Sequence, residues 1–174
     1  MSIRHVFAVD PGDVNNGFCY FKHDSVTKTA DTKIMKVMGP KELSDMLKVI
    51  WGIGQAKEPD FPDQPNPNNM FFVIENFRSD TLVRGAIFQW NEMLTSQMIG
   101  RVKMCAEWME APVYMQEPSQ VLNPGRKIVF PLFGKLPQHI PDEKSAFIHG
   151  VHWMLSKKLI RTIDQVTLFG QEKL

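Results

Sequence analysis

Short apolar runs separated by polar turns are the main pattern along this chain, and they predict a sheet with helices. Residues 6–9 form a continuous apolar run that ends at Asp10, and residues 71–74 form another that ends at Glu75. Runs of this kind are typical of central strands that are buried on both faces. Both predicted strands therefore end on a carboxylate.

Turn signals and helical periodicity predict the remaining elements. The break at Pro11 and Gly12 and the sequence Asn-Asn-Gly at 15–17 predict a tight hairpin with positive φ angles. We expect further strands at residues 18–21, 33–38 and 113–115, helices over 40–54 and 91–110 and from Pro141 onwards, an exposed Pro/Asn-rich loop over 56–69, and an irregular, basic segment over 117–137. The resulting order, β-β-β-α-β-α-β-α, describes an α/β fold with a mixed sheet flanked by helices.

The composition fits a single domain. The chain has 174 residues, of which 43% are hydrophobic and 22% charged, and a chain of this length builds one core. Two cysteines are too few for a disulfide framework, and the apolar runs are far shorter than the ~20 residues that span a bilayer. We expect a cytoplasmic protein without a membrane segment, with its domain at residues 1–160 and a tail at 161–174.

The net charge of +1 conceals an uneven distribution. Residues 118–161 carry Asp142 and Glu143 as their acidic side chains, against the basic residues Arg126, Lys127, Lys135, Lys144, Lys157, Lys158 and Arg161. A local basic face can bind phosphate groups even when the whole chain is nearly neutral. An ordinary solvated surface is the alternative.

Three carboxylates are candidates for a shared site. Asp10 and Glu75 follow predicted strands, and Asp142 opens the last predicted helix. If the two strands are neighbours, both carboxylates emerge at one edge of the sheet. Clustered carboxylates repel one another unless cations lie between them, and oxygen ligands suit Mg²⁺ or Mn²⁺. The alternative is that each residue only caps a turn, a strand or a helix.

Three segments in chain order resemble the motifs of a known family. They are Val-Asp-Pro-Gly at residues 9–12, Val-Ile-Glu-Asn-Phe at 73–77 and Pro-Asp-Glu-Lys-Ser-Ala at 141–146. Their order and spacing are similar to those of the RuvC-type Holliday-junction resolvases, which have the RNase H-like fold, and a small phage-encoded member is the most similar subtype. The resemblance covers most of the chain.

The resemblance implies hydrolysis of phosphodiester bonds in four-way or branched DNA with two Mg²⁺ ions, for which Mn²⁺ can substitute. Asp10, Glu75 and Asp142 would be the catalytic, metal-binding residues, with Glu143 as a further ligand. The family usually has another acid at the position of Ser145, so this chain departs from the pattern there.

Other residues receive auxiliary or DNA-binding roles. Lys144 would neutralise charge in the transition state, and His149, on the same helical face as Asp142, would orient a water or a ligand, although packing is the commoner role of a helical histidine. The expected DNA contacts are Phe77, Arg78, Arg126, Lys127 and Lys135.

Two surfaces predict protein partners. Met93, Ser96, Gly100 and Met104 form a second stripe on the long helix, and the resemblance implies a homodimer, which would use this stripe. In the tail, Gln165, Leu168 and Phe169 resemble the short peptide that binds a bacterial sliding clamp. A terminal strand that packs on the domain is the alternative.

Two other functions remain open. The chain could be a different RNase H-like nuclease that acts on RNA–DNA hybrids or flaps, or a junction-binding protein that has lost activity because position 145 is Ser. Cleavage of a synthetic four-way junction discriminates between them.

Overall fold

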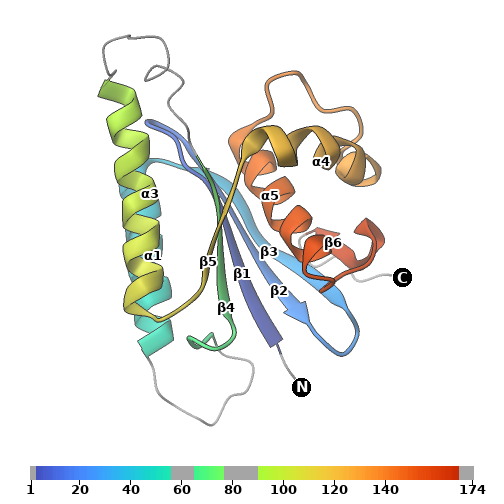
Figure 1. Ribbon diagram of the computed structural model, residues 1–174, viewed down its shortest axis with the longest axis horizontal. Coiled ribbons are helices and arrows are strands. Elements are labelled where there is room, and N and C mark those ends of the chain that lie inside the picture. Colours follow the sequence, from blue (N-terminus) through green and yellow to red (C-terminus); the bar gives the residue numbers. More distant parts are fainter. Residues whose placement is uncertain (1–2, 56–64, 77–89, 169–174) are drawn as a thin grey trace.

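The computed structural model describes residues 3–55, 65–76 and 90–168, which form a six-stranded mixed sheet with helices on both faces (Figure 1). In sheet order the strands are β5 (Val113–Gln116), β4 (Met70–Glu75), β1 (Ile3–Asp10), β2 (Asn16–Asp24), β3 (Thr29–Met38) and β6 (Val166–Leu168). The helices are α1 (Pro40–Gln55), α3 (Trp90–Trp108), α4 (Pro118–Phe133), α5 (Asp142–Ser156) and the short 3₁₀ helix η1 (Ile163–Gln165). The predicted mixed α/β sheet is confirmed.

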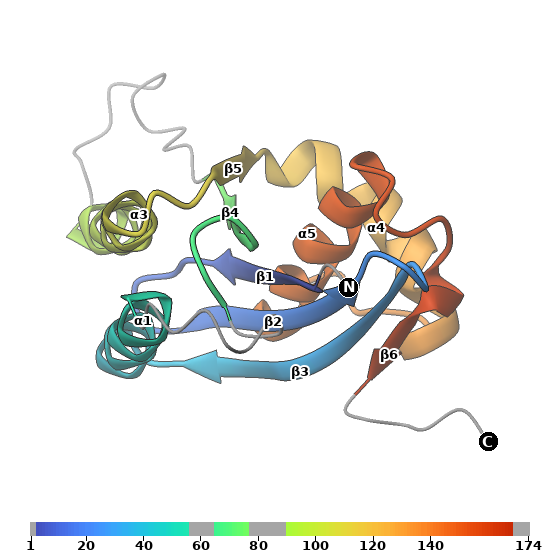
Figure 2. The same cartoon turned by 90° about the horizontal axis from the view of Figure 1, so that it is seen from below.

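The sheet separates two apolar cores. α1 and α3 cover one face, and α4 and α5 cover the other (Figures 1 and 2). Side chains of β1 alternate between them: Val6 and Ala8 belong to the core under α5, whereas Phe7 and Val9 belong to the core under α1 and α3. β1 is therefore a central strand buried on both faces, as its continuous apolar run predicts.

The connection between β1 and β2 differs from the predicted tight hairpin. None of the residues 15–17 has a positive φ angle, and Asn16 already belongs to β2. The Asn16 side chain accepts a hydrogen bond from the Gly12 backbone N–H (3.2 Å) and donates one to the Met38 carbonyl (3.2 Å). A buried side-chain amide, rather than left-handed backbone, therefore holds this connection.

The structure contains a helix that the sequence pattern did not predict. α4 occupies most of the segment interpreted as irregular, and it contains two internal prolines, Pro124 and Pro131. Its buried residues, Val121, Gly125 and Val129, are four positions apart and so lie on one face. This face packs on α5, and the packing offsets the backbone hydrogen bonds that the prolines remove.

The C-terminal segment up to residue 168 is part of the domain. β6 pairs in parallel with β3, and Val166 is buried in the core under α5. The order predicted from the sequence lacks this strand as well as α4. Residues 161–168 pack on the domain, as the terminal-strand alternative expects, whereas Phe169 lies outside the described residues.

Two further predictions concern the loop and the membrane. The predicted loop 56–69 is described from residue 65, and residues 65–69 contain a turn and no helix or strand. None of the helices within the described ranges is long and apolar enough to cross a membrane.

Candidate active site

Three strands end side by side at one edge of the sheet, and each ends on a polar residue. β1 ends at Asp10, β4 at Glu75 and β5 at Gln116. β4 lies parallel to both neighbours, with Val9 opposite Ile74 and Glu75 opposite Gln116. The two carboxylates therefore meet at the carboxyl edge of the sheet, as predicted from the sequence.

Gly17 brings α5 to the same edge. It is the partner of Asp10 in the β1–β2 ladder, and a Cβ atom on Gly17 would lie 1.9 Å from the backbone carbonyl oxygen of Asp142. A side chain at this position would collide with the first turn of α5, so glycine allows the helix to lie directly on β2. This contact places the start of α5, and with it Asp142, beside Asp10.

The Asp10 carboxyl group is strongly perturbed by its surroundings. Burial raises its pKa from the ordinary 3.8 to about 8, and the nearby charges of Glu75 and Asp142 act in the same direction. The nearby Ser145 hydroxyl group opposes the rise, whereas a hydrogen bond shared with Glu75 adds to it. A hydrogen bond between two carboxyl groups requires a proton on one of them, and the raised pKa of Asp10 assigns the proton to that group.

The pKa of Asp142 is also raised. Burial is the main cause; the nearby His139 lowers the pKa, while Glu143 and Glu75 raise it. Among the described residues, no three His, Cys, Asp or Glu side chains form a group that could hold a metal ion as they lie here. The oxygen donors suit a hard divalent cation, and such an ion would relieve the repulsion that adds to the effect of burial on both pKa values. The carboxylates thus fit the chemistry of Mg²⁺ without being preassembled around an ion.

Glu75 is bound by two side chains of α5. Ser145 Oγ donates to Glu75 Oε2 at 3.2 Å, and His149 Nε2 lies 2.9 Å from the same oxygen. His149 Nδ1 lies 2.8 Å from Oε1 of Gln116. Ser145 and His149 therefore contact a candidate catalytic carboxylate directly.

Sequence reasoning did not single out Gln116. The signal was present, because the residue ends the short strand 113–116, just as Asp10 and Glu75 end theirs. Only the pairing of β5 with β4 shows that this strand end belongs to the same edge.

The predicted DNA-binding residues fall into two groups. The Arg126 guanidinium donates to the backbone carbonyls of residues 136–138, so it holds the loop that leads into α5. Lys127 and Lys135 are exposed and available for phosphate groups.

The remaining predicted site residues are Lys144, Phe77 and Arg78. The Lys144 ammonium lies 5.4 Å from the centre of the Phe133 ring, a cation–π contact that fixes the side chain near the start of α5. Phe77 and Arg78 lie outside the described residues.

No protein-family model matches the sequence, and no curated protein matches it significantly. Two solved structures of RuvC from Thermus thermophilus are similar to the chain. One is 14% identical with a TM-score of 0.53, covering 88% of this chain and 96% of RuvC. The other, a complex with a Holliday junction substrate, is 15% identical with a TM-score of 0.51, covering 89% and 96%. The chain has the RuvC fold.

The RuvC fold confirms the RNase H-like architecture that the three sequence motifs imply. The similarity extends over nearly the whole length of RuvC. At this level of identity the similarity establishes the fold, and the assignment of Asp10, Glu75 and Asp142 rests on their positions in this chain.

Proposed function

We propose that this protein is a metal-dependent, structure-selective endonuclease that cleaves four-way or other branched DNA by hydrolysing phosphodiester bonds. The observation that carries the proposal is the convergence of Asp10, Glu75 and Asp142 at one edge of a sheet with the RuvC fold. The RuvC structure in complex with a Holliday junction substrate supports the choice of branched DNA. The proposal includes a role in DNA recombination or repair in the cytoplasm, and the phage origin stays a prediction from the sequence resemblance.

Asp10, Glu75 and Asp142 would hold two Mg²⁺ ions, or Mn²⁺ in their place, with Glu143 as an additional ligand. Bound divalent cations supply a water of lowered pKa and stabilise charge on the leaving oxygen. Asp10 has to release its proton to act as a ligand, because a pKa of about 8 keeps its carboxyl group mostly protonated at pH 7. Lys144, near the start of α5, would offset the charge of the reacting phosphate.

Lys127 and Lys135 would bind DNA phosphates outside the carboxylate site. Lys127 lies on α4, Lys135 follows the end of that helix, and both side chains are exposed. α4 packs on α5, which carries Asp142, so these charges belong to the same side of the sheet as the site. Contacts by Phe77 and Arg78 stay predictions from the sequence.

Incubation of the protein with a synthetic four-way junction and Mg²⁺ tests the proposal. We expect cleavage by the wild type, and a loss on the order of 100-fold or more in Asp10→Asn, Glu75→Gln and Asp142→Asn. Retained cleavage in Asp10→Asn would contradict the site. Binding without cleavage would identify an inactive junction-binding protein, and preference for RNA–DNA hybrid or flap substrates would identify another RNase H-like nuclease.

The stripe predicted to form a homodimer reaches the surface of α3. Ser96 and Gly100 are exposed, and Met104 is 44% exposed. A Cβ atom at Gly100 would meet nothing within 4 Å, so a second helix has room to approach closely there. The side chain of Met93 lies outside the described set. The homodimer is proposed through this face.

An apolar groove between α1 and α3 adjoins this face. It encloses about 390 Å³ and includes Trp51 and Trp108, which are 42% and 61% exposed and make an edge-on ring contact at 6.5 Å. Exposed aromatic side chains of this size are typical of protein interfaces, so the proposed dimer would extend over the groove.

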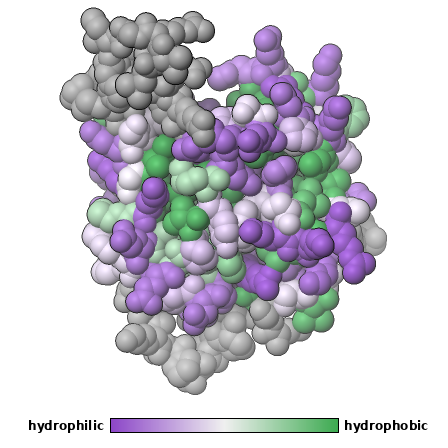
Figure 3. Space-filling model, viewed as in Figure 1, coloured by the Kyte–Doolittle hydropathy of each residue, from purple (hydrophilic) through white to green (hydrophobic). Residues whose placement is uncertain are grey.

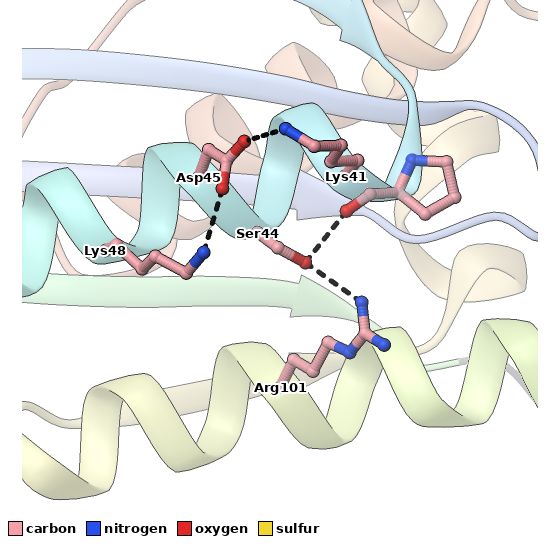
Figure 4. A network of polar contacts seen from close by, with 6 residues as sticks. Lys41, Ser44, Asp45, Lys48 and Arg101 are labelled. Carbon is pink, nitrogen blue, oxygen red and sulfur yellow. Dashed lines mark hydrogen bonds and ion pairs between the residues drawn. The ribbon is translucent and has the colours of Figure 1, made fainter.

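A polar network rims the groove. Arg101 on α3 donates to Ser44 Oγ on α1 at 2.9 Å (Figure 4). Lys41 and Lys48 both pair with Asp45, at 2.8 and 2.9 Å. The Arg101–Ser44 bond joins the two helices, whereas both lysine–aspartate pairs lie within α1. Together they give the apolar groove a polar and charged border, the usual arrangement of an interface rim.

Binding of a sliding clamp through the tail is a further proposal. Gln165 Oε1 accepts hydrogen bonds from the backbone N–H groups of Arg161 and Thr162, and Leu168 belongs to β6. Clamp binding would therefore require β6 to leave the sheet. A pull-down with wild type and a Leu168→Ala, Phe169→Ala double variant tests it: recovery of the clamp by the wild type alone supports binding, and equal recovery contradicts it.

A further inference from the structure

The two α5 donors reach the same oxygen atom of Glu75. Ser145 Oγ and His149 Nε2 both bond to Glu75 Oε2. The donors are four positions apart and so lie on one face of the helix. Ser145 is 3% exposed and His149 is 0% exposed, so bulk water does not compete for these bonds. Two bonds on one oxygen fix the rotation of the carboxylate.

Gln116 supports His149 from the neighbouring strand. The amide of Gln116 faces Nδ1 at 2.8 Å, and the register of β5 with β4 places Gln116 opposite Glu75. A side-chain amide can present either its oxygen or its N–H group to Nδ1. It therefore complements the ring in either case and leaves Nε2–H to donate to Glu75.

We infer that His149 and Gln116 are positioning residues for the Glu75 carboxylate, with Gln116 acting through His149. The inference rests on the proposed function, because that function makes Glu75 a metal ligand. At position 145, where the family resemblance predicts an acid, a hydroxyl completes the pair of donors with His149. The site thus contains one carboxylate fewer than that resemblance implies. Hydrogen bonds from α5 orient the Glu75 carboxylate.

Binding of Mn²⁺ to the DNA-free full chain, measured by electron paramagnetic resonance, tests the inference. We expect His149→Leu to weaken binding about 10- to 100-fold, the usual effect of removing a group that orients a metal ligand. His149→Gln should recover part of the loss, because its amide N–H can donate to Glu75. Gln116→Leu should weaken binding less, by roughly 3- to 10-fold, because it acts one bond further away.

The nitrogen spectrum of His149 gives a readout that does not depend on metal. ¹⁵N resonances of the wild-type ring should show Nε2 protonated, and Gln116→Leu should shift the Nδ1 resonance. An unprotonated Nε2 in the wild type would overturn the inference. If His149→Leu does not fold, the inference is tested by this spectrum and by the Mn²⁺ affinities of His149→Gln and Gln116→Leu.

His23 provides a matched control. It is equally buried, and its Nε2 lies 2.9 Å from the Leu159 carbonyl, away from the carboxylates. His23→Leu should lower the free energy of unfolding and leave Mn²⁺ affinity unchanged. A loss of affinity in His149→Leu no larger than in His23→Leu would overturn the inference.

The same measurements separate this inference from the proposed function. A wild type that cleaves the junction and binds Mn²⁺ no better than His149→Leu overturns the inference alone. A wild type that neither binds Mn²⁺ nor cleaves overturns both.

Discussion

The carboxylate edge and the groove between α1 and α3 depart in opposite directions from the usual distribution of side chains. At the edge, Asp10, Ser145 and His149 are polar and largely buried. In the groove, Trp51 and Trp108 are apolar and exposed. Elsewhere on the face shown in Figure 3, small apolar patches are interspersed with hydrophilic side chains.

The difference lies in where each region finds its partners. The buried polar groups bond to one another across β4, β5 and α5, so the edge is ordered by the chain itself, and a cation would remove the repulsion that is left. In the apolar groove, Trp51 and Trp108 are exposed to solvent, and a second chain would bury them. The edge is thus typical of a reaction site and the groove of an interface.

The largest expected effect concerns Asp10 and pH. Its pKa is 3.8 in the unfolded chain and about 8 in the folded protein, so the folded state binds the extra proton between these values. Stability should therefore be highest below about pH 4 with respect to this group and should fall as pH rises towards 8. Asp10→Asn removes the penalty, and we expect its free energy of unfolding at pH 8 to exceed that of the wild type by a few kcal/mol, roughly 2–5.

Urea unfolding at pH 5 and pH 8 measures this effect. Asp45→Asn is the control, because Asp45 is exposed and its pKa is lowered to about 2 by hydrogen bonds with Lys41 and Lys48. It should show the same change between the two pH values as the wild type. If the free energy of unfolding of Asp10→Asn changed between pH 5 and pH 8 as much as that of the wild type, the pKa of Asp10 would not be raised in the folded protein.

A charge in the proposed interface should change the mass of the particle. The chain has a mass of 20.0 kDa, so light scattering should give twice this value for the wild type and the single value for Gly100→Glu, because a buried unpaired charge is costly. Gly39→Glu places the same charge where a Cβ atom also meets nothing within 4 Å, but outside α1 and α3, and should stay dimeric. A monomeric wild type would contradict the proposal that the groove is a dimer interface.

The smallest expected effects concern the exposed lysines. Lys127→Ala and Lys135→Ala should each weaken junction binding a few-fold and lower the dependence of log affinity on log salt by about 1 per phosphate contact. Fluorescence anisotropy over a salt series measures both quantities. Lys41→Ala, on the groove side and paired with Asp45, should match the wild type. Equal slopes for all three variants would mean that α4 does not face the DNA.

Most of the sheet was predictable because its central strands have unambiguous patterns. Residues 6–9 and 71–74 are too apolar for an exposed position, and each ends on an acid that has no place in the core. Their parallel pairing follows from general rules of α/β topology. The elements that the sequence pattern did not predict are those in which tertiary packing overrides local preference. α4 tolerates its prolines because α5 covers it, and β6 is a strand because it pairs with the edge of β3.

The carboxylates of the site were predictable, whereas their surroundings were not. Asp10, Glu75 and Asp142 are marked by the ends of elements in the sequence. The roles of Gln116 and His149 depend on the register of β5 and the rotation of α5, which no local pattern records. Asn16 was likewise interpreted as a turn residue, and only the fold shows that its amide joins Gly12 to Met38.

Gly17 shows that a position without a side chain can be as restrictive for chemistry as an acidic one. Even a methyl group at this position would have to displace the backbone of α5 at Asp142. The displacement of the helix would move Ser145 and His149 away from Glu75. Saturation mutagenesis scored by nuclease activity should therefore find Gly17 as intolerant as the carboxylates, although it has no side chain and carries no charge. In a relative that has the three acids and a larger residue at this position, α5 would have to pack further from β2.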